Sequence, residues 1–324
     1  MKILKPFKHV SPKTVEEAAA LLSVGKAKLM AGGTDLLTVL KDRIHKDHPE
    51  LIIDLKTIPN LDYIVEDSGF LKIGALAKLA EIAQSPLVKG KYRVLADAAK
   101  SVGSPQIRNV GTIGGNLCQE VRCLYYRYPH HVGERIICYR KGGRVCYAVS
   151  GNNLYHAILG GPTKCYAVHP SDMAPALIAL DAKVKTTKRT VRLEEFFDPL
   201  TGTILDSDEV LTEIQVPTPP DGSRQVWIKF RLRKSIDFAI AAVALLLTLD
   251  GDKCEDVRIV LGGVAPTPWR SKDAEDAVRG KPINEAVAEE AGKAAVKNAV
   301  PLTQNAYKIQ VVKALVKRAI LSSV

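Results

Sequence analysis

Five of the six cysteines in this 324-residue chain lie between positions 118 and 165, with the spacing C-x4-C-x14-C-x7-C-x18-C. In a cytoplasmic protein, clustered cysteines more often bind metal or do redox chemistry than form disulfides. Four thiolates suit either a tetrahedral zinc ion or a 4Fe–4S cluster. His130 and His131 are further candidate zinc ligands, but we expect them to be exposed loop residues. The spacing alone leaves three alternatives open: an iron–sulfur cluster, zinc, or structural cysteines without metal.

Two glycine turns form a second group of residues that could bind a ligand. AGGTDLL (31–37) and GTIGGN (111–116) both place paired glycines beside small polar residues. Glycines in such turns let backbone N–H groups approach an anion closely, and Thr34 adds a hydroxyl donor. Neither turn is a GxGxxG fingerprint or a phosphate-binding GK[ST] motif. Each alone is typical of an ordinary tight turn, whereas two together can hold a pyrophosphate from both sides.

The first turn requires a small α/β unit to position it. TVEEAAALL begins with a capping box, Thr14 with Glu17 three residues on, which predicts a helix. A short apolar strand precedes the glycine pair, and a second helix is expected to start near Thr34. ELIIDL (50–55) is a short apolar run between polar segments, which predicts a buried strand.

The second turn belongs to another α/β region, which starts near Leu61. GFLKIGALAKLAEIA predicts a strand followed by a helix, and YRVLADAAKSV a further helix. SPQIRNVGTIGGNL (104–117) is rich in glycine and small polar residues, which favours a loop with tight turns. The cysteine segment then interrupts the region as an insertion. A loop, a helix and two strands are expected between Cys165 and residue 197.

A separate α+β domain is expected after PTPPDGS (217–223), a linker candidate dense in proline and glycine. Its sequence predicts long strands or a mixture of strand and helix, and then two helices within residues 284–300 and 306–321. Basic RLRK (231–234) lies in strand-like sequence, and Cys254 in a hydrophilic turn. No role is assigned to Cys254.

The charge and hydropathy of the chain limit the classes of partner. The net charge is +11, but the basic residues are spread along the chain, which favours solvated faces and a docking surface for an acidic partner over nucleic-acid binding. The longest apolar run, 238–249, has 12 residues and is too short to span a bilayer. MKILKPFKHV lacks the apolar core of a signal peptide. We therefore expect a cytoplasmic protein that binds neither nucleic acid nor membrane.

Four motifs together resemble one known family. AGGTDLL, TIGGNL, HPSDMAPALIALDA (169–182) and GGVAPTPWRSKDAE (262–275) resemble, in order and spacing, the FAD-binding medium subunit of the molybdenum hydroxylases, which include xanthine dehydrogenase and carbon monoxide dehydrogenase. The resemblance covers almost the whole chain. It implies an α+β protein with a two-subdomain FAD-binding domain of the vanillyl-alcohol-oxidase (PCMH) type, residues 1–216, divided at about 56 and carrying an insertion at 118–165. A C-terminal α+β domain of the CO dehydrogenase flavoprotein type, an antiparallel sheet with helices, occupies 217–324.

The resemblance also implies which residues bind FAD. They come from both glycine turns, from the HPSD motif and from a basic position near the flavin. They are Leu29, Met30, Ala31, Gly32, Gly33, Thr34, Asp35, Leu36, Val102, Gly111, Thr112, Ile113, Gly114, Gly115, Asn116, Asp172 and Lys229. Asp237 is expected to be structural, and no catalytic acid, base or nucleophile is expected.

The cysteine insertion is similar to one branch of the family, the β subunit of 4-hydroxybenzoyl-CoA reductase. That resemblance implies a 4Fe–4S cluster on Cys123, Cys138, Cys146 and Cys165, with Cys118 as a buried neighbour. Surrounding positive charge would ease reduction of such a cluster; the alternative is that the basic residues form a solvated loop face. The basic residues in question are Arg122, Arg127, Arg135, Arg140, Lys141 and Arg144.

The function implied is electron transfer within a heterotrimeric molybdenum enzyme. A molybdopterin-binding large subunit and a small subunit with 2Fe–2S clusters would be the partners, assembled as a dimer of heterotrimers. The branch implies reductive dehydroxylation to benzoyl-CoA, with electrons from a low-potential donor such as ferredoxin. The alternative is another hydroxylase of the family that passes electrons outward to NAD or a quinone, with zinc or a purely structural insertion.

Overall fold

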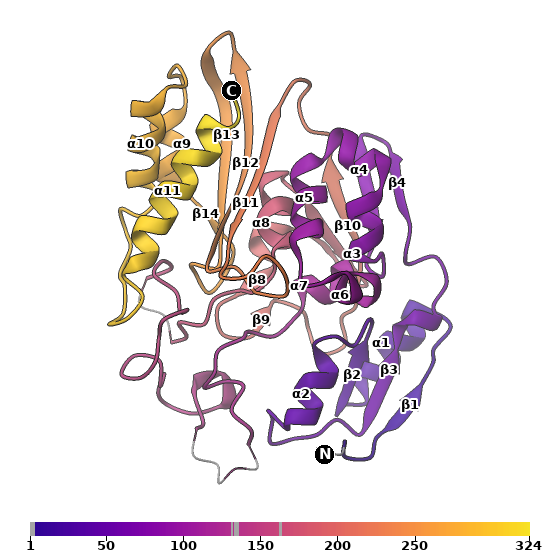
Figure 1. Ribbon diagram of the computed structural model, residues 1–324. Coiled ribbons are helices and arrows are strands. Elements are labelled where there is room, and N and C mark those ends of the chain that lie inside the picture. Colours follow the sequence, from indigo (N-terminus) through magenta and orange to yellow (C-terminus); the bar gives the residue numbers. More distant parts are fainter. Residues whose placement is uncertain (1–3, 131, 133–135, 162–163) are drawn as a thin grey trace.

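The computed structural model describes residues 4–130, 132, 136–161 and 164–324. Its N-terminal unit is a parallel three-stranded sheet of order β1-β3-β2 with two helices (Figure 1). The elements are β1 (Lys8–Val10), α1 (Val15–Ser23), β2 (Ala27–Met30), α2 (Leu36–Asp42) and β3 (Leu51–Asp54). The Thr14 side chain accepts a hydrogen bond from the Glu17 backbone N–H at 3.1 Å, so the predicted helix start is confirmed.

A five-stranded antiparallel sheet of order β4-β5-β10-β6-β7 forms the second unit. Its strands are β4 (Ile64–Asp67), β5 (Phe70–Gly74), β6 (Lys183–Thr186), β7 (Thr190–Arg192) and β10 (Leu211–Pro217), and a small hairpin adds β8 (Phe197–Asp198) and β9 (Gly202–Thr203). Its helices are α3 (Leu79–Gln84), α4 (Pro86–Lys91), α5 (Arg93–Ser101), α6 (Pro105–Val110), α7 (Ile113–Leu117) and α8 (Met173–Ala179). Apolar side chains of β5, β10, α3, α5 and α8 share one buried core.

The expectation of a loop with tight turns over residues 104–117 is wrong, because α6 and α7 occupy most of it. Ser104 caps α6 by accepting from the Ile107 N–H at 3.4 Å, and Pro105 follows at the first helical position. Thr112 caps α7 by accepting from the Gly115 N–H at 3.2 Å. Side-chain caps therefore stabilise two short helices in a sequence whose glycines favour turns.

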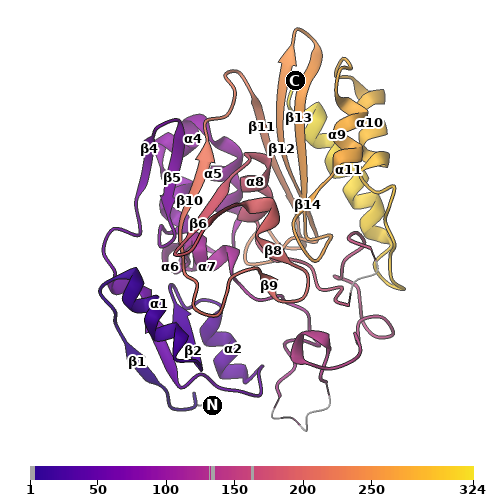
Figure 2. The same cartoon turned by 180° about the vertical axis from the view of Figure 1, so that it is seen from behind.

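The C-terminal domain is an antiparallel sheet of order β11-β12-β13-β14. The elements are β11 (Arg224–Phe230), β12 (Ala241–Asp250), β13 (Lys253–Gly262), β14 (Trp269–Arg270), α9 (Lys272–Val278), α10 (Glu285–Ala294) and α11 (Tyr307–Leu321). Helices α9 to α11 cover one face, while α5 and α8 pack against the other (Figures 1 and 2). Both faces of β12 are therefore buried, which explains its continuous apolar run.

Three details of this domain differ from expectation. Helix α9 was not predicted. The basic residues 231–234 lie in the loop between β11 and β12 rather than in a strand. Cys254 lies in β13 and is 1 % exposed, so it is a buried strand residue rather than part of a hydrophilic turn.

The cysteine segment runs irregularly at one end of the molecule (Figures 1 and 2). Its described part contains a 3-10 turn, Tyr139–Lys141. A similar turn at Leu55–Thr57 packs with the N-terminal unit, and one at Leu193–Glu195 belongs to the second unit. Apolar side chains of the segment pack against Val39 and Ile44, at helix α2 and just beyond it. Among the described residues, no helix combines the length and apolarity that a membrane crossing needs.

Candidate functional site

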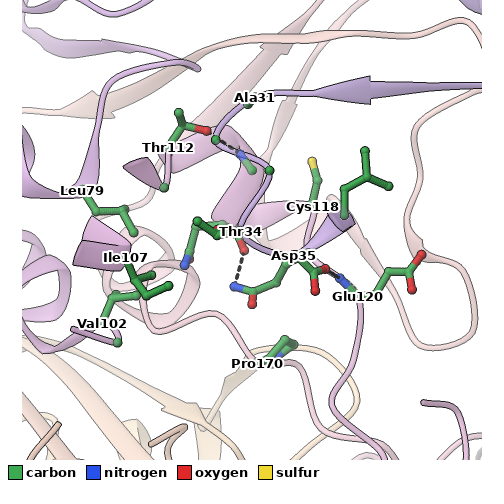
Figure 3. Close-up of a pocket in the computed structure, with 18 of the residues that line it drawn as sticks. Ala31, Thr34, Asp35, Leu79, Val102, Ile107, Thr112, Cys118, Glu120 and Pro170 are labelled. Atoms are coloured by element: carbon green, nitrogen blue, oxygen red, sulfur yellow. Dashed lines mark hydrogen bonds between the residues drawn. The ribbon is translucent and has the colours of Figure 1, made fainter. Parts of the chain in front are cut away.

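A cavity of about 390 Å³ lies where the N-terminal unit, the second unit and the loop after β11 meet. Figure 3 shows Thr34 and Asp35 at its centre, with the apolar side chains of Leu79, Val102 and Ile107 to one side. Cys118 and Glu120 lie on the opposite side. Both glycine turns contribute to its wall, so the structure brings together two motifs that are about 80 residues apart in the sequence.

Close packing explains the glycine pair of the first turn. A Cβ atom added at Gly32 would lie 2.1 Å from the carbonyl oxygen of Val110, beside the second turn. Gly33 has φ +70°, in the left-handed region that favours glycine. The two turns can therefore lie against each other only when position 32 has no side chain.

Fifteen of the seventeen residues predicted to bind FAD line this cavity. The other two, Ile113 and Gly114, lie in α7 and are buried away from it. Gly114 packs against Ala75, since an added Cβ would lie 2.9 Å from the Ala75 carbonyl oxygen. Ile113 and Gly114 thus support the second turn from the buried side of α7.

Two of the predicted charged residues, Asp172 and Lys229, form a buried ion pair with Nζ 2.5 Å from Oδ2. Their side chains are 5 % and 3 % exposed. Burial raises the pKa of Asp172 above its ordinary value, and the charge of Lys229 opposes this shift. Asp237 accepts hydrogen bonds from Arg233 and also lines the cavity.

Sequence reasoning missed several residues of the wall, including Leu79, Ile107, Glu120 and Ile236. Ile236 has φ +65°, which is an outlier for a β-branched residue. Its N–H donates to the Gly103 carbonyl at 3.0 Å, which holds the strained loop against the second unit. No sequence pattern marks such a position, because the strain arises from contact between distant segments.

Asp35 ties the first glycine turn to the cysteine segment. Its Oδ1 accepts from Arg122 at 2.5 Å and from Arg127 at 2.8 Å, and its Oδ2 accepts from the Glu120 N–H at 2.8 Å. These donors lie within a few residues of Cys123. The Asp35 carboxylate therefore bonds to protein groups and fixes the segment beside the cavity.

The four cysteines singled out by the resemblance, Cys123, Cys138, Cys146 and Cys165, line one small cavity of about 10 Å³. Cys118 lines the larger cavity instead and is exposed, so the expectation that it is a buried neighbour is wrong. The two cavities are adjacent, because Tyr126 lines the cysteine cavity and its hydroxyl donates at 2.8 Å to Glu120, which lines the larger one. The structure thus separates the fifth cysteine of the group from the other four.

Hydrogen-bond donors surround these sulfur atoms. Burial raises the pKa of Cys123 to about 11, against the N–H groups of Tyr126 and Tyr125, which favour its thiolate. Burial raises the pKa of Cys138 in the same way, against the N–H groups of Arg140 and Lys141. Arg140 Nε donates to Cys165 Sγ at 3.3 Å. The raised pKa values of Cys123 and Cys138 favour the protonated thiols, and the donors are placed to stabilise thiolates if a cation binds.

The space between the four cysteines is small, about 10 Å³. In the described part of the chain, no three or more His, Cys, Asp or Glu side chains are grouped closely enough to hold one metal ion. Four cysteines around one cavity match in number the four thiolates that a 4Fe–4S cube takes, one at each iron. His130 lines a different, basic cavity, and His131 and Arg135 lie outside the described residues.

Comparison with known protein families matches almost the whole chain. Residues 5–219 match the FAD-binding domain in molybdopterin dehydrogenase, and residues 228–323 match the CO dehydrogenase flavoprotein C-terminal domain. The aldehyde oxidoreductase FAD-binding subunit PaoB of Escherichia coli is 36% identical over 84% of this chain and 86% of its own length. The carbon monoxide dehydrogenase medium chain of Hydrogenophaga pseudoflava is 31% identical over 97% of this chain and 96% of its own.

Solved structures agree with these matches. Carbon monoxide dehydrogenase from Hydrogenophaga pseudoflava, in a form that lacks the Mo-pyranopterin moiety, aligns with a TM-score of 0.79 at 30% identity, over 99% of this chain and 98% of that chain. Quinoline 2-oxidoreductase from Pseudomonas putida shares the fold, with a TM-score of 0.78 at 22% identity over 99% and 98% of the two chains. The expected α+β fold, an FAD-binding domain followed by a CO dehydrogenase-type domain, is confirmed. The chain belongs to the FAD-binding medium subunits of the molybdenum hydroxylase family and is an oxidoreductase subunit.

Proposed function

We propose that this chain is an electron-transfer subunit that holds FAD in the larger cavity and a 4Fe–4S cluster in the cysteine cavity. The observation that carries this proposal is the convergence of four cysteines from a fifty-residue segment on one cavity, next to the cavity built by the two glycine turns. When bound, the two groups would supply one- and two-electron redox chemistry, and the protein sets their position and surroundings.

The glycine turns would hold the FAD diphosphate. Gly32, Gly33 and Gly115 leave backbone at the cavity wall without side chains in front of it. The apolar side chains of Val102 and Ile107 exclude water from one side of the cavity, as a flat aromatic ring requires. Asp172 and Lys229 would present polar groups at a fixed position, because their ion pair restrains both side chains.

Cys123, Cys138, Cys146 and Cys165 would bind the iron atoms, one thiolate to each. Arg140 places a positive charge and an N–H donor at Cys165, which offsets part of the negative charge of a four-thiolate site. Backbone N–H groups do the same at Cys123 and Cys138. The chain's own residues thus neutralise and desolvate the site.

The partners in this proposal are a molybdenum-binding large subunit and a small subunit with 2Fe–2S clusters, assembled as a dimer of heterotrimers in the cytoplasm. The names of the relatives support a multi-subunit assembly, since two are a medium chain and a medium subunit. The net charge of +11 suits an acidic electron-carrier protein such as ferredoxin.

The reductive reaction on 4-hydroxybenzoyl-CoA remains a proposal supported by the cysteine insertion. A second candidate is outward electron transfer from an oxidised substrate to NAD, a quinone or a carrier protein. The names of three relatives favour it: an aldehyde oxidoreductase, a carbon monoxide dehydrogenase and a nicotinate dehydrogenase. Reduction of the complete complex by an aldehyde, in the absence of any other donor, would select the outward direction. Reduction by ferredoxin alone, with turnover of 4-hydroxybenzoyl-CoA, would select the reductive one.

The test of the cofactor assignment is metal and flavin analysis of the anaerobically purified chain. We expect about four irons and about one FAD per chain. Cys146→Ser should lose the iron and keep the flavin, because Cys146 lines only the cysteine cavity. The matched control, Cys118→Ser, should keep the iron, because Cys118 does not line that cavity. Zinc or no metal in the unmodified chain would contradict the cluster, and absence of flavin after reconstitution would contradict the larger site.

A further inference from the structure

We propose that His156 is a positioning residue for the iron–sulfur site: its Nε2–H donates a hydrogen bond to Cys123 Sγ and raises the reduction potential of the cluster. This inference rests on the proposed function, since it needs a cluster in the cysteine cavity. His156 lies outside every motif that the sequence analysis singled out, in the stretch NNLYHAILGG.

The contact is specific and shielded from water. Nε2 of His156 lies 3.2 Å from Sγ of Cys123, within hydrogen-bond distance for sulfur. The residue is 5 % exposed, and its ring lies against that of Tyr125 at 6.3 Å between centroids. The ring is therefore shielded from bulk water, with Cys123 Sγ within reach of Nε2.

The backbone of His156 is held by the C-terminal domain. Its carbonyl oxygen accepts from Lys308 Nζ and from Asn305 Nδ2, each at 3.1 Å. Its N–H donates to the Asn153 carbonyl at 2.9 Å. The backbone of His156 is therefore fixed on both sides of its Cα. Helix α11 and the residues just before it, and not the cysteine segment alone, set the direction of its side chain.

The direction of the hydrogen bond follows from the protonation of the sulfur. An imidazole N–H can lie on Nδ1 or on Nε2. An iron-bound thiolate has no proton to offer, so the contact is attractive only when an imidazole proton is on Nε2. An N–H donor at this position withdraws electron density from the sulfur.

The effect on the cluster follows from this geometry. Reduction adds negative charge to the cluster and its sulfur ligands. An N–H donor at a ligand sulfur stabilises the reduced state more than the oxidised state, and this raises the potential. Removal of the donor should therefore make the cluster harder to reduce without removing any ligand.

The experiment is a redox titration of the anaerobically purified full chain, followed by the electron paramagnetic resonance signal of the reduced cluster. It compares the unmodified chain with His156→Leu, His156→Gln and the control His48→Gln. His48 does not line the cysteine cavity; its ring lies at Phe7 and its Nε2 near the Lys5 carbonyl. Iron and FAD content are measured on the same samples.

We expect His156→Leu to keep its iron and to shift the cluster midpoint to a more negative potential. His156→Gln should recover part of this shift, because the Gln amide nitrogen can reach the position of Nε2 and donate. His48→Gln should leave the midpoint unchanged. An unchanged midpoint in iron-loaded His156→Leu overturns the proposal, as does loss of iron from both His156 variants, which would make His156 a ligand or a purely structural residue. Absence of iron from the unmodified chain would instead overturn the proposed function, and this inference with it.

Discussion

At the scale of single residues, the site depends on backbone segments that approach each other so closely that a side chain between them would clash. Gly32 packs against the carbonyl of Val110, and Asp35 uses both carboxylate oxygens for donors of the cysteine segment. The first glycine turn therefore connects three parts of the chain: the N-terminal unit, the second glycine turn and the cysteine segment. The glycines themselves could be predicted from the motif. The partners of Asp35 could not, because they lie more than 80 residues away.

A Gly32→Ala substitution tests this packing. Its Cβ would lie 2.1 Å from the Val110 carbonyl oxygen, so the first turn must move away from the second. We expect the flavin content of the purified protein to fall by roughly ten-fold or more, as befits a loss of about 1.4 kcal/mol or more in binding. The control Gly90→Ala adds a Cβ in open space on α4 and should leave flavin content unchanged. Full flavin occupancy in Gly32→Ala would show that the two turns do not act together.

At the scale of elements, caps and periodicity decide what the sequence can predict. The helix at Val15 and the strand at Leu51 were predicted because their signals are local: a capping box and a bounded apolar run. Helices α6 and α7 were missed because glycines outweighed the caps at Ser104 and Thr112. The hydrogen bond of His156 to Cys123 was also beyond prediction, since α11 fixes His156 from 152 residues away.

Glu209 holds the β6–β7 hairpin against the start of β10. This contact gives a prediction about the pH dependence of stability. Its carboxylate accepts from Thr186 Oγ1 at 2.6 Å, from Arg189 at 2.8 Å and from the Asp206 N–H at 3.0 Å. Burial alone would raise the pKa of Glu209, yet Arg189 and these other donors hold it at about 2, below the ordinary 4.5. The stability that this carboxylate contributes is complete above about pH 4.5 and is lost as the pH falls toward 2.

We therefore expect Glu209→Gln to lower the free energy of unfolding by about 1–3 kcal/mol at pH 6, with a smaller difference at pH 3. Urea unfolding at the two pH values measures this. Glu194→Gln, an exposed carboxylate near the same hairpin, should change stability by less than about 0.5 kcal/mol. A difference between Glu209→Gln and the unmodified chain that grows on acidification would contradict the assigned role.

At the scale of the whole molecule, the C-terminal domain does more than complete the wall of the larger cavity. Its loop after β11 supplies Ile236 and Phe238 to the cavity wall, and the ring of Phe238 lies 4.8 Å from the guanidinium of Arg122 in the cysteine segment. Its helix α11 reaches the far end of the same segment through Lys308. The cysteine segment is thus held at both ends by other parts of the protein, which explains how a largely irregular chain can carry a fixed set of sulfur atoms.

Lys308 gives the sharpest test of this arrangement. It is fully buried, and its Nζ donates to the carbonyls of Gly263 at 2.8 Å, Tyr155 at 2.9 Å and His156 at 3.1 Å. Lys308→Met would leave the Gly263 and Tyr155 carbonyl groups without this donor, whereas that of His156 would keep its hydrogen bond from Asn305, and we expect the free energy of unfolding to fall by about 2–5 kcal/mol. The same change frees one end of the cysteine segment, so limited proteolysis within residues 150–161 should become faster.

The control on the same helix is Lys317→Met. Lys317 forms a surface ion pair with Glu285 at 2.8 Å, and its removal should cost less than about 1 kcal/mol and leave proteolysis of the segment unchanged. Denaturant unfolding and mass spectrometry of the proteolytic fragments measure both effects. If Lys308→Met loses stability but the segment is cut no faster, then Lys308 supports only the packing of α11. If both change together, helix α11 anchors the cysteine segment, and a variant in the C-terminal domain can alter the cysteine cavity without replacing any of its cysteines.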